Sequence, residues 1–430
     1  MENRSSSLTF ILILCITVSG YSKDISVEFN SQLEAIHVIQ DDQPEKALST
    51  IDNLLNSENL NSKEKGLLFF TQGQILNRNL YNHDEAIISY YKALRYFREI
   101  DDIDNQSKTL GRLGRLYKDL FQYDYALEYY NSILDLPLQN PVKLLYAKYN
   151  IAKTYRLRGD YDEAISIQQE ILKEFIERDL IVDIVDSHLE MGVSYIGLKN
   201  WEKATQHYKE VDNVLSKSSI TQDRYKAKVL GSLGFITLKQ KQYELAEKYL
   251  LQALPIMESL DDDQMLTIQY NSLGMLALET NQNERAIKYF QESLKLNPDK
   301  ADKAELKNAL NELIKIHKRS GNLDEALSYS EQLNDLTVPF IELSQNLDKL
   351  HKQYQAESAQ YVIKQFELKE SLIQAQMRNT IIGTILIAIF SISLVLFIGY
   401  KRRQKVDDST IKALKAKYRE LYLVYEKDNL

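Results

Sequence analysis

The sequence predicts an all-α protein whose main part is a solenoid of helical hairpins. An alanine recurs about every 40 residues, and small and large side chains keep a fixed distance from it. On both sides of short polar turns such as "RGDY" (158–161) and "LKNW" (198–201), apolar residues recur at three- and four-residue steps. A single hairpin cannot bury its own apolar face, so repeated hairpins must stack into a curved array with a concave side.

The repeat is read from three sets of positions. The alanines lie at intervals of 38 to 42 residues, at Ala47, Ala86, Ala126, Ala164, Ala204, Ala246, Ala286 and Ala326. Upstream of them come the small residues Ala35, Gly114, Ala152, Gly192, Gly234 and Gly274, and four residues downstream come Ile51, Tyr90, Tyr130, Tyr208, Leu250 and Phe290. We expect the small residues to let the two helices of a hairpin cross closely, and the aromatic residues to fill the space between hairpins.

At this register "GRLGRLYKDLFQYDYALEYYNSILDLP" (111–137) and "SLGMLALETNQNERAIKYFQESLKLNP" (272–298) superimpose. The chain resembles the tetratricopeptide repeat (TPR) family over residues 30–335, about eight units, most clearly in 108–138, 146–174, 186–214, 228–256 and 268–298. The spacing near 40 exceeds the family's period of about 34, which predicts longer helices or links. The resemblance implies that the first helix of each unit lines a concave groove, in which extended peptides bind.

The first 22 residues read as a secretory signal peptide (1–22). Arg4 precedes the apolar run Leu8–Val18, and Gly20 and Ser22 have the spacing that a signal peptidase recognises. A buried helix is the alternative. Cys15, the only cysteine, lies in this run, so we expect a mature chain that uses neither disulfides nor thiol chemistry.

A second apolar segment, residues 380–400, predicts one transmembrane helix. Its 21 uncharged residues, at about 1.5 Å each, span roughly 31 Å, the thickness of a bilayer core. Lys401, Arg402 and Arg403 follow it, whereas Arg378 alone is close before it. The positive-inside rule therefore predicts a single-pass membrane protein with a periplasmic or other extracytoplasmic array and a cytoplasmic C-terminus.

Two further helical segments flank this span. Residues 340–379 contain no proline or glycine, which predicts a long connecting helix, with only a broken heptad of apolar residues at Leu347, Leu350, Tyr354, Tyr361, Phe366 and Leu372. Residues 401–430 form a basic cytoplasmic tail with nine Lys or Arg against five Asp or Glu. Its coiled-coil seam, by which the chain could form a homo-oligomer, runs through Ile411, Leu414, Tyr418, Leu421 and Tyr425.

The composition and motifs argue against several function classes. The net charge is −8, and without the basic tail the remaining 400 residues carry about −12. This acidic balance does not favour direct nucleic-acid binding. The six histidines form no HExxH motif, and His188 and Glu190, two residues apart on a helix, point to different faces. The glycines form no phosphate-binding loop, and acidic runs such as residues 261–263 fit solvated turns better than calcium ligands. We therefore expect no enzyme, no metal and no cofactor.

One constellation of side chains stands out as a candidate partner-binding site. The first helices of two adjacent units carry basic and amide groups at Arg112, Arg115 and Lys118, and at Asn150, Lys153 and Arg156. The resemblance implies that they face the concave groove, where some family members hold a peptide carboxylate with similar groups. The strict Lys/Asn arrangement of those members is missing, and a solvated basic face is the alternative.

The order of these segments is similar to that of bacterial envelope regulators, in which a periplasmic repeat array is joined through one span to a cytoplasmic output domain. The leading hypothesis is a membrane-anchored scaffold or sensor that binds protein or peptide ligands outside and oligomerises or recruits a partner inside. A second hypothesis is a truncated transcriptional regulator or histidine kinase relative, because only 30 residues follow Tyr400. A third is an envelope assembly factor that holds client proteins without signalling.

Overall fold

A computed structural model describes residues 25–57, 59–218, 223–298 and 301–427 of the chain. The predicted all-α class is confirmed, because the described residues form helices joined by turns and contain no strand. The chain divides into two compact units, Met1–Lys352 and Gln353–Leu430. The predicted signal peptide, residues 1–22, lies outside the described residues.

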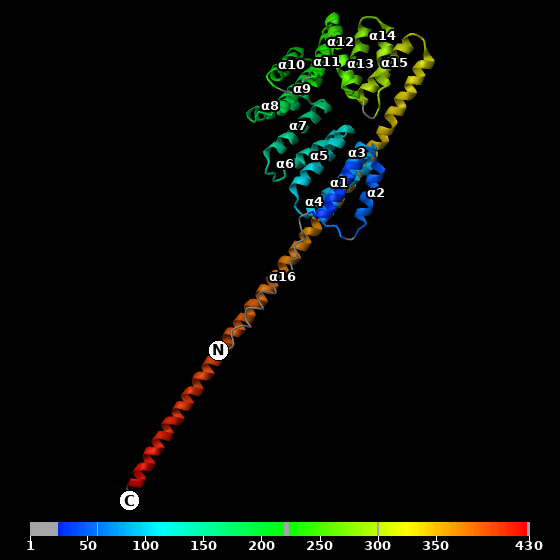
Figure 1. Ribbon diagram of the computed structural model, residues 1–430. Helices are drawn as coiled ribbons and strands as arrows, with labels where there is room; N and C mark the ends of the chain where they lie inside the picture. Colours follow the sequence, from blue (N-terminus) through cyan, green and yellow to red (C-terminus); the bar gives the residue numbers. More distant parts are fainter. Residues whose placement is uncertain (1–24, 58, 219–222, 299–300, 428–430) are drawn as a thin grey trace. The chain divides into compact units, whose positions relative to one another are not determined.

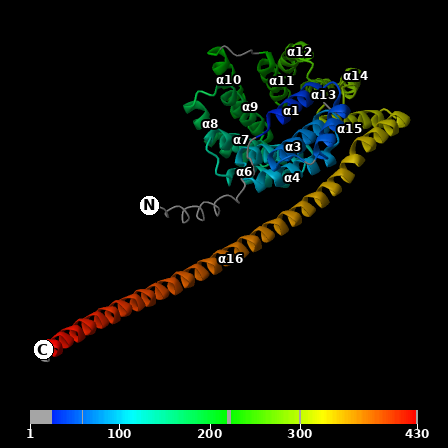
Figure 2. The same ribbon diagram turned by 60° about the horizontal axis from the view of Figure 1, so that its bottom comes forward.

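The first unit is a TPR-like solenoid of helical hairpins that follow one another in chain order (Figure 1), as a second view of the same unit also shows (Figure 2). The first helices of the hairpins are α1 (Val27–Ile39), α3 (Ser62–Arg78), α5 (Ile103–Asp119), α7 (Pro141–Arg158), α9 (Ile181–Gly197), α11 (Asp223–Lys239), α13 (Asp263–Glu279) and α15 (Lys303–Arg319). The second helices are α2 (Pro44–Leu55), α4 (His83–Glu99), α6 (Tyr123–Leu134), α8 (Tyr161–Glu177), α10 (Trp201–Ser216), α12 (Tyr243–Ser259), α14 (Asn283–Leu294) and the start of α16 (Leu323–Lys427).

A short turn closes these hairpins. From the α3/α4 hairpin onward, one residue of each turn has a positive φ angle: Tyr81, Phe121, Gly159, Lys199, Lys241, Asn281 or Gly321. This left-handed residue reverses the chain, and the residue after it stands before the first turn of the next helix. Glycine adopts such angles without steric cost, so Gly159 (φ 99°) and Gly321 (φ 79°) relieve two of the turns of strain.

The crossing of the two helices within a hairpin differs from the expectation in one respect. A Cβ atom added to Gly114 would lie 2.7 Å from Cε1 of Tyr130, which belongs to the same hairpin. The same close approach joins three further pairs: Gly73 to Tyr90, Gly192 to Tyr208 and Gly274 to Phe290. Each ring therefore occupies the volume that its own hairpin's glycine leaves empty, which was not predicted. Tyr208 and Phe290 also belong to core clusters that include residues of the next first helix, as expected for aromatic residues between hairpins.

Neighbouring hairpins stack where each second helix packs against the next first helix, and their first helices also touch. Successive first helices are in contact from α5 to α15, that is α5 with α7, α7 with α9, α9 with α11, α11 with α13, and α13 with α15. The second helices α2 to α14 each pack between their own first helix and the next one. Helix α10, for example, buries Ala204, Tyr208 and Val211 in this position. In a curved array the helices that approach one another most closely lie on the inner side, and we call the surface they form the first-helix face.

Helix α16 begins at Leu323 and ends at Lys427, which is earlier than the predicted start at residue 340. The second helix of the last hairpin continues through Pro339, although a proline inside a helix removes one backbone hydrogen bond. Within its described part, α16 is long and apolar enough to cross a membrane, and none of the apolar stretch is buried. Ile411 and Leu414 of the predicted seam are exposed, and the side chains of the other seam residues lie outside the described ones.

Candidate functional site

The six predicted partner-binding residues lie on two first helices that contact each other, α5 and α7. Arg112, Arg115 and Lys118 belong to α5, and Asn150, Lys153 and Arg156 belong to α7. We call these six residues the basic wall. Burial lowers the pKa of Lys118, and the charge of Lys153 on the neighbouring helix lowers that pKa further.

A carboxylate that the sequence did not point to lies against the basic wall. Glu190 of α9 accepts a hydrogen bond from Arg156 Nε at 2.5 Å and lies 3.4 Å from Lys153 Nζ. The side chain of Glu190 is 14% exposed and that of Arg156 is 16% exposed, so the pair is largely removed from water. Burial alone would raise the pKa of Glu190, but Arg156 and Lys153 outweigh burial and lower that pKa to about 2.

The α5 side of the basic wall has its own acidic partner. Asp119 lies 3.5 Å from Arg115 Nε and 3.6 Å from Lys118 Nζ. Arg115 remains 64% exposed, whereas the side chain of Lys118 is 9% exposed, and burial lowers the pKa of its ammonium. Arg115 is therefore the cation of this wall that reaches farthest into solvent, and an exposed i,i+4 pair such as Arg115 with Asp119 is weak.

The remaining two wall residues are oriented locally. Asn150 is partly buried, and its Nδ2 donates to the backbone carbonyl of Tyr146 one turn earlier, at 2.8 Å. Arg112 is partly buried, and its charge acts on Tyr90 of α4, whose pKa burial raises to about 12 and Arg112 lowers in part. The structure thus gathers Lys118, Lys153 and Arg156 closely, and leaves Arg112 and Asn150 at the margin.

The charges continue in alternating sign along the first-helix face. On α9, burial raises the pKa of Asp186, and the ammonium of Lys228 on α11 partly offsets that rise. Burial also lowers the pKa of Lys228, and Asp186 partly offsets that fall. The order along the array is then cationic on α5 and α7, anionic on α9 and cationic on α11. Such a face can bind a polar chain by exchanging its internal ion pairs for ligand groups.

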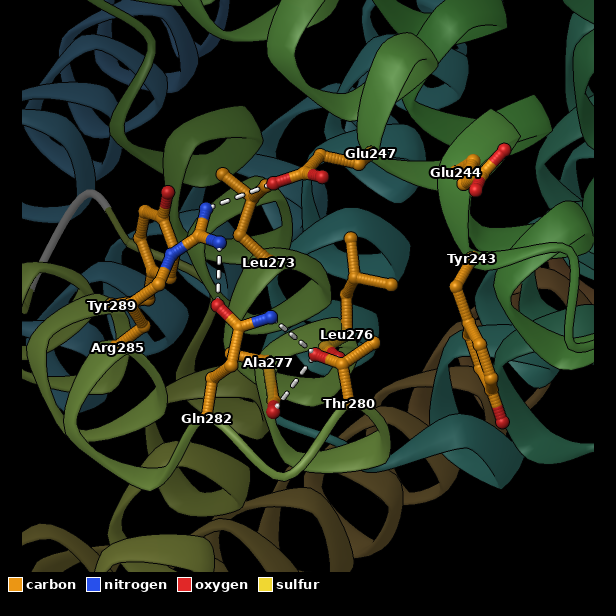
Figure 3. Close-up of a pocket in the computed structure, with 10 residues that line it drawn as sticks. All are labelled: Tyr243, Glu244, Glu247, Leu273, Leu276, Ala277, Thr280, Gln282, Arg285 and Tyr289. Carbon is orange, nitrogen blue, oxygen red and sulfur yellow. Dashed lines mark hydrogen bonds and ion pairs between the residues drawn. The ribbon is translucent and has the colours of Figure 1, made fainter.

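A small cavity lies elsewhere in the array, between α12, α13 and α14 (Figure 3). Its volume is about 110 Å³, and its apolar part is formed by Leu273, Leu276 and Ala277. Arg285 lies in it but is already held, with Nη2 2.9 Å from Glu247 Oε1 and Nη1 donating to Gln282 Oε1 at 2.6 Å. This cavity takes no residue from the basic wall.

Two histidines that are far apart in sequence meet in the α9/α10 hairpin. Nδ1 of His188 and Nδ1 of His207 are 3.0 Å apart, and the ring of Tyr195 stacks on that of His207. The distance fits a hydrogen bond between two neutral imidazoles. Among the residues that the structure describes, no group of three or more His, Cys, Asp or Glu side chains is arranged to hold a metal ion.

Comparison with protein families matches three stretches of the chain. The tetratricopeptide repeat is matched at residues 107–140, 144–173 and 225–299. These stretches cover most of α5 to α8 and of α11 to α14, and all six residues of the basic wall lie inside matched repeats.

The relatives matched by sequence are distant. The chain is 33% identical to the uncharacterised protein ycf37 of Guillardia theta, over 29% of this chain and 66% of that protein. It is 22% identical to response regulator aspartate phosphatase I of Bacillus subtilis, over 46% of this chain and 49% of that protein. A TPR repeat-containing protein of Methanocaldococcus jannaschii is 23% identical, over 54% of this chain and 43% of its own length. The chain thus spans between 43% and 66% of the length of these three relatives.

Solved structures share the fold at low sequence identity. A Rap protein complexed with competence and sporulation factor has a TM-score of 0.51 at 13% identity, over 78% of this chain and 93% of that one. A tetratricopeptide repeat protein from Parabacteroides merdae has a TM-score of 0.50 at 16% identity, over 63% of this chain and 94% of that one. At these identities the likeness shows the helical-repeat fold alone.

Proposed function

Because the chain is a tetratricopeptide-repeat protein, we propose that it is a membrane-anchored scaffold or sensor whose repeat array binds acidic segments of protein or peptide ligands. Stacked helical hairpins present an extended surface for such partners. The proposed ligand lies along the first-helix face and places a carboxylate against the basic wall.

The observation that carries this proposal is the position of Glu190. Lys153 and Arg156, on neighbouring turns of α7, already engage one carboxylate at 3.4 and 2.5 Å in a largely dry setting. Charge-assisted hydrogen bonds of this kind are roughly twice as strong as neutral ones. A ligand carboxylate of the same chemistry fits the same two donors, and Arg115, which is exposed on the adjacent helix, provides the first long-range attraction.

The membrane part of the proposal rests on α16. Residues 380–400 would form the span, and Lys401, Arg402 and Arg403 would stay in the cytoplasm by the positive-inside rule. The array then lies outside the cytoplasm, exported by the N-terminal apolar segment, and the tail pairs with a second copy or with a partner helix. Reporter fusions at residues 200 and 410 test this topology. An active cytoplasmic reporter at residue 200 would disprove it.

Binding is tested with the full-length chain in detergent and two sets of synthetic peptides, one ending in several glutamates and one with glutamines in their place. We expect the acidic peptides to bind and their affinity to fall as salt is raised, because exposed charges are screened. The double variant Arg115→Glu/Arg156→Glu should lose this binding while its circular dichroism spectrum keeps the wild-type helical content.

The matched control is Lys173→Glu/Lys209→Glu, which makes the same change of charge at exposed positions of the second helices α8 and α10. This control should bind the acidic peptides as well as the wild type, apart from a small effect of net charge. Equal binding by the wall variant and the wild type would place the binding surface elsewhere on the array.

A further inference from the structure

The helix that leaves the last hairpin also packs against a part of the array that is far away in sequence. Ser344, Leu347, Asp348 and His351 follow the i, i+3, i+4, i+7 spacing of one helix face of α16. Leu347 is fully buried and His351 is 4% exposed. All four belong to the first compact unit, which ends at Lys352. We call this face of α16 the latch.

The latch is held by polar contacts with the α5/α6 hairpin. Gln122 Nε2 donates to Ser344 Oγ at 2.8 Å, and the hydroxyl of Tyr125 donates to a carboxylate oxygen of Asp348. The ring of Tyr125 stacks on that of His351, with the ring centres 3.9 Å apart.

His351 uses both of its ring nitrogens in the latch. Nδ1 lies 2.8 Å from the hydroxyl of Tyr129, and Nε2 lies 3.1 Å from Oε2 of Glu128. A stacked, doubly hydrogen-bonded and buried imidazole specifies one position of α16 relative to α6, because a shifted helix would leave these groups buried and unpaired.

A chain of tyrosine hydroxyls extends the latch into two further helices. The hydroxyl of Tyr129 lies 2.9 Å from that of Tyr91 on α4, which lies 2.5 Å from that of Tyr117 on α5. Tyr117 is fully buried and stands in sequence between Arg115 and Lys118 of the basic wall. Helix α5 therefore carries both Tyr117, the end of this hydroxyl chain, and two wall residues within one turn, so a movement of α5 at the wall also moves Tyr117.

We propose that this contact is a ligand-controlled latch, closed while Glu190 and Asp119 hold the cations of the basic wall and released when an acidic ligand takes those cations over. The inference rests on the proposed function and adds its regulation. In the latched structure the wall is satisfied internally, with Arg156 on Glu190 and Lys118 near Asp119. A ligand carboxylate has to separate these pairs, which shifts α5 and α7 relative to α9 and strains the Tyr117 end of the hydroxyl chain.

The coupling must be reciprocal. A ligand that favours the open latch binds more tightly once the latch is opened by mutation, by the same factor by which the ligand itself promotes opening. Coupling between two sites in proteins is typically about 5- to 150-fold in affinity. The last hairpin, which α16 leaves, would thus respond to the occupancy of hairpins that lie early in the chain.

The test uses the full-length chain in detergent and two variants that weaken the latch. His351→Ala removes the whole imidazole, and Tyr129→Phe keeps the ring but removes one hydroxyl. Lys349→Ala is the matched control, because Lys349 is exposed and lies next to the latch in sequence. Hydrogen exchange without ligand is followed in residues 344–351, in α5 and, as a remote reference, in α13.

We expect both latch variants to speed exchange in residues 344–351 and in α5, and to leave α13 and the Lys349→Ala control unchanged. Faster exchange in residues 344–351 alone would overturn the coupling to the wall. Unchanged exchange in residues 344–351 would show that these contacts do not secure α16.

The second measurement uses a fluorescein-labelled peptide of eight glutamates with a free C-terminus. We expect His351→Ala to bind it at least 5-fold more tightly than the wild type, and Lys349→Ala to bind it as the wild type does. Equal binding by all three would overturn the latch while the proposed function stands. Absence of binding in all three would instead disprove the proposed function for acidic ligands and the ligand control with it, and the exchange measurement would still decide the link between latch and wall.

Discussion

The ring of Tyr130 fills the space beside Gly114, with Cε1 2.7 Å from the position that a Cβ atom on Gly114 would take. Tyr130 is 1% exposed and sits on the second helix of the hairpin, opposite the glycine of the first. Real Cβ atoms do not approach a ring this closely, so the pair has to be changed together.

Gly114→Ala should therefore destabilise the array by about 1–3 kcal/mol, the usual cost of overpacking a core. The double variant Gly114→Ala/Tyr130→Leu should cost less than the two single changes added together, because leucine leaves room for the new methyl group. Urea denaturation of all four proteins measures the coupling. Strict additivity would mean that the helices separate instead of keeping this contact.

The fourth hairpin offers the complementary case. Ala152 takes the place of the glycine, and Gln168 takes the place of the aromatic residue on α8. Gln168 is 1% exposed, and neither polar atom of its amide has a hydrogen-bond partner among the described residues. Unpaired buried polar groups cost about 1–3 kcal/mol each.

We expect Gln168→Met to raise the free energy of unfolding by roughly 1–3 kcal/mol, because methionine has a similar shape and needs no hydrogen bonds. Gln168→Asn is the contrasting variant: it keeps an amide, removes a methylene group and should lower stability. Thermal melts of the three proteins in one buffer decide the matter, and a lower melting temperature for Gln168→Met would speak for a bound water at this amide.

The Glu190 ion pair predicts a specific dependence of stability on pH. The pKa of the Glu190 carboxyl is about 2 in the folded chain and roughly 4.3 in the unfolded chain. Between about pH 2 and pH 4.3 the unfolded state therefore binds more protons than the folded state. The stabilisation is complete above about pH 5 and is lost as pH falls towards 2. At one pKa unit per 1.36 kcal/mol, it amounts to about 3 kcal/mol.

Glu190→Gln should therefore be destabilised by about this amount at pH 7, and the difference from the wild type should nearly vanish only at about pH 2 and below, as measured by urea denaturation at each pH. Asp162→Asn, on the exposed start of α8, serves as the control. A difference between Glu190→Gln and the wild type that does not change with pH would mean that packing, and not charge, accounts for it.

The pair His188 and His207 predicts a loss of stability on acidification at a higher pH than that of Glu190. Burial first, and then the neighbouring His188, lower the pKa of His207 to about 4, and burial also lowers the pKa of His188. In the unfolded chain these imidazoles become protonated near about pH 6.5, whereas in the folded chain they stay neutral to a lower pH. Stability therefore falls as pH drops from about 6.5 to 4.

His207→Phe should remove part of this loss, because phenylalanine keeps a ring against Tyr195 and cannot be protonated. The measurement is the change in melting temperature between pH 7 and pH 4.5, and the variant should show a smaller change than the wild type. The surface variant His37→Phe, on α1, is the control and should behave as the wild type. An unchanged pH dependence in His207→Phe would assign the acid sensitivity to other groups.

The sequence by itself determined the features that repeat or depend on composition. The alanine, glycine and aromatic periods gave the hairpins because helix crossings need small residues at fixed intervals, and the run 380–400 identified an apolar helix of bilayer length. The repeat period also placed the six residues of the basic wall on two neighbouring first helices, because equivalent positions of adjacent repeats stack.

Only the tertiary structure decided which partners these residues meet. Glu190 stands 34 residues from Arg156 with no periodic mark, and the first helices had to stack before its carboxylate could reach the wall. His351 and Tyr129 are 222 residues apart, and of the latch residues the sequence singled out only Leu347, as part of a broken heptad. Local sequence periods specify which face of a helix is buried. Which distant segments meet depends on the curvature added up over all the hairpins, and the sequence of a single repeat does not determine that total.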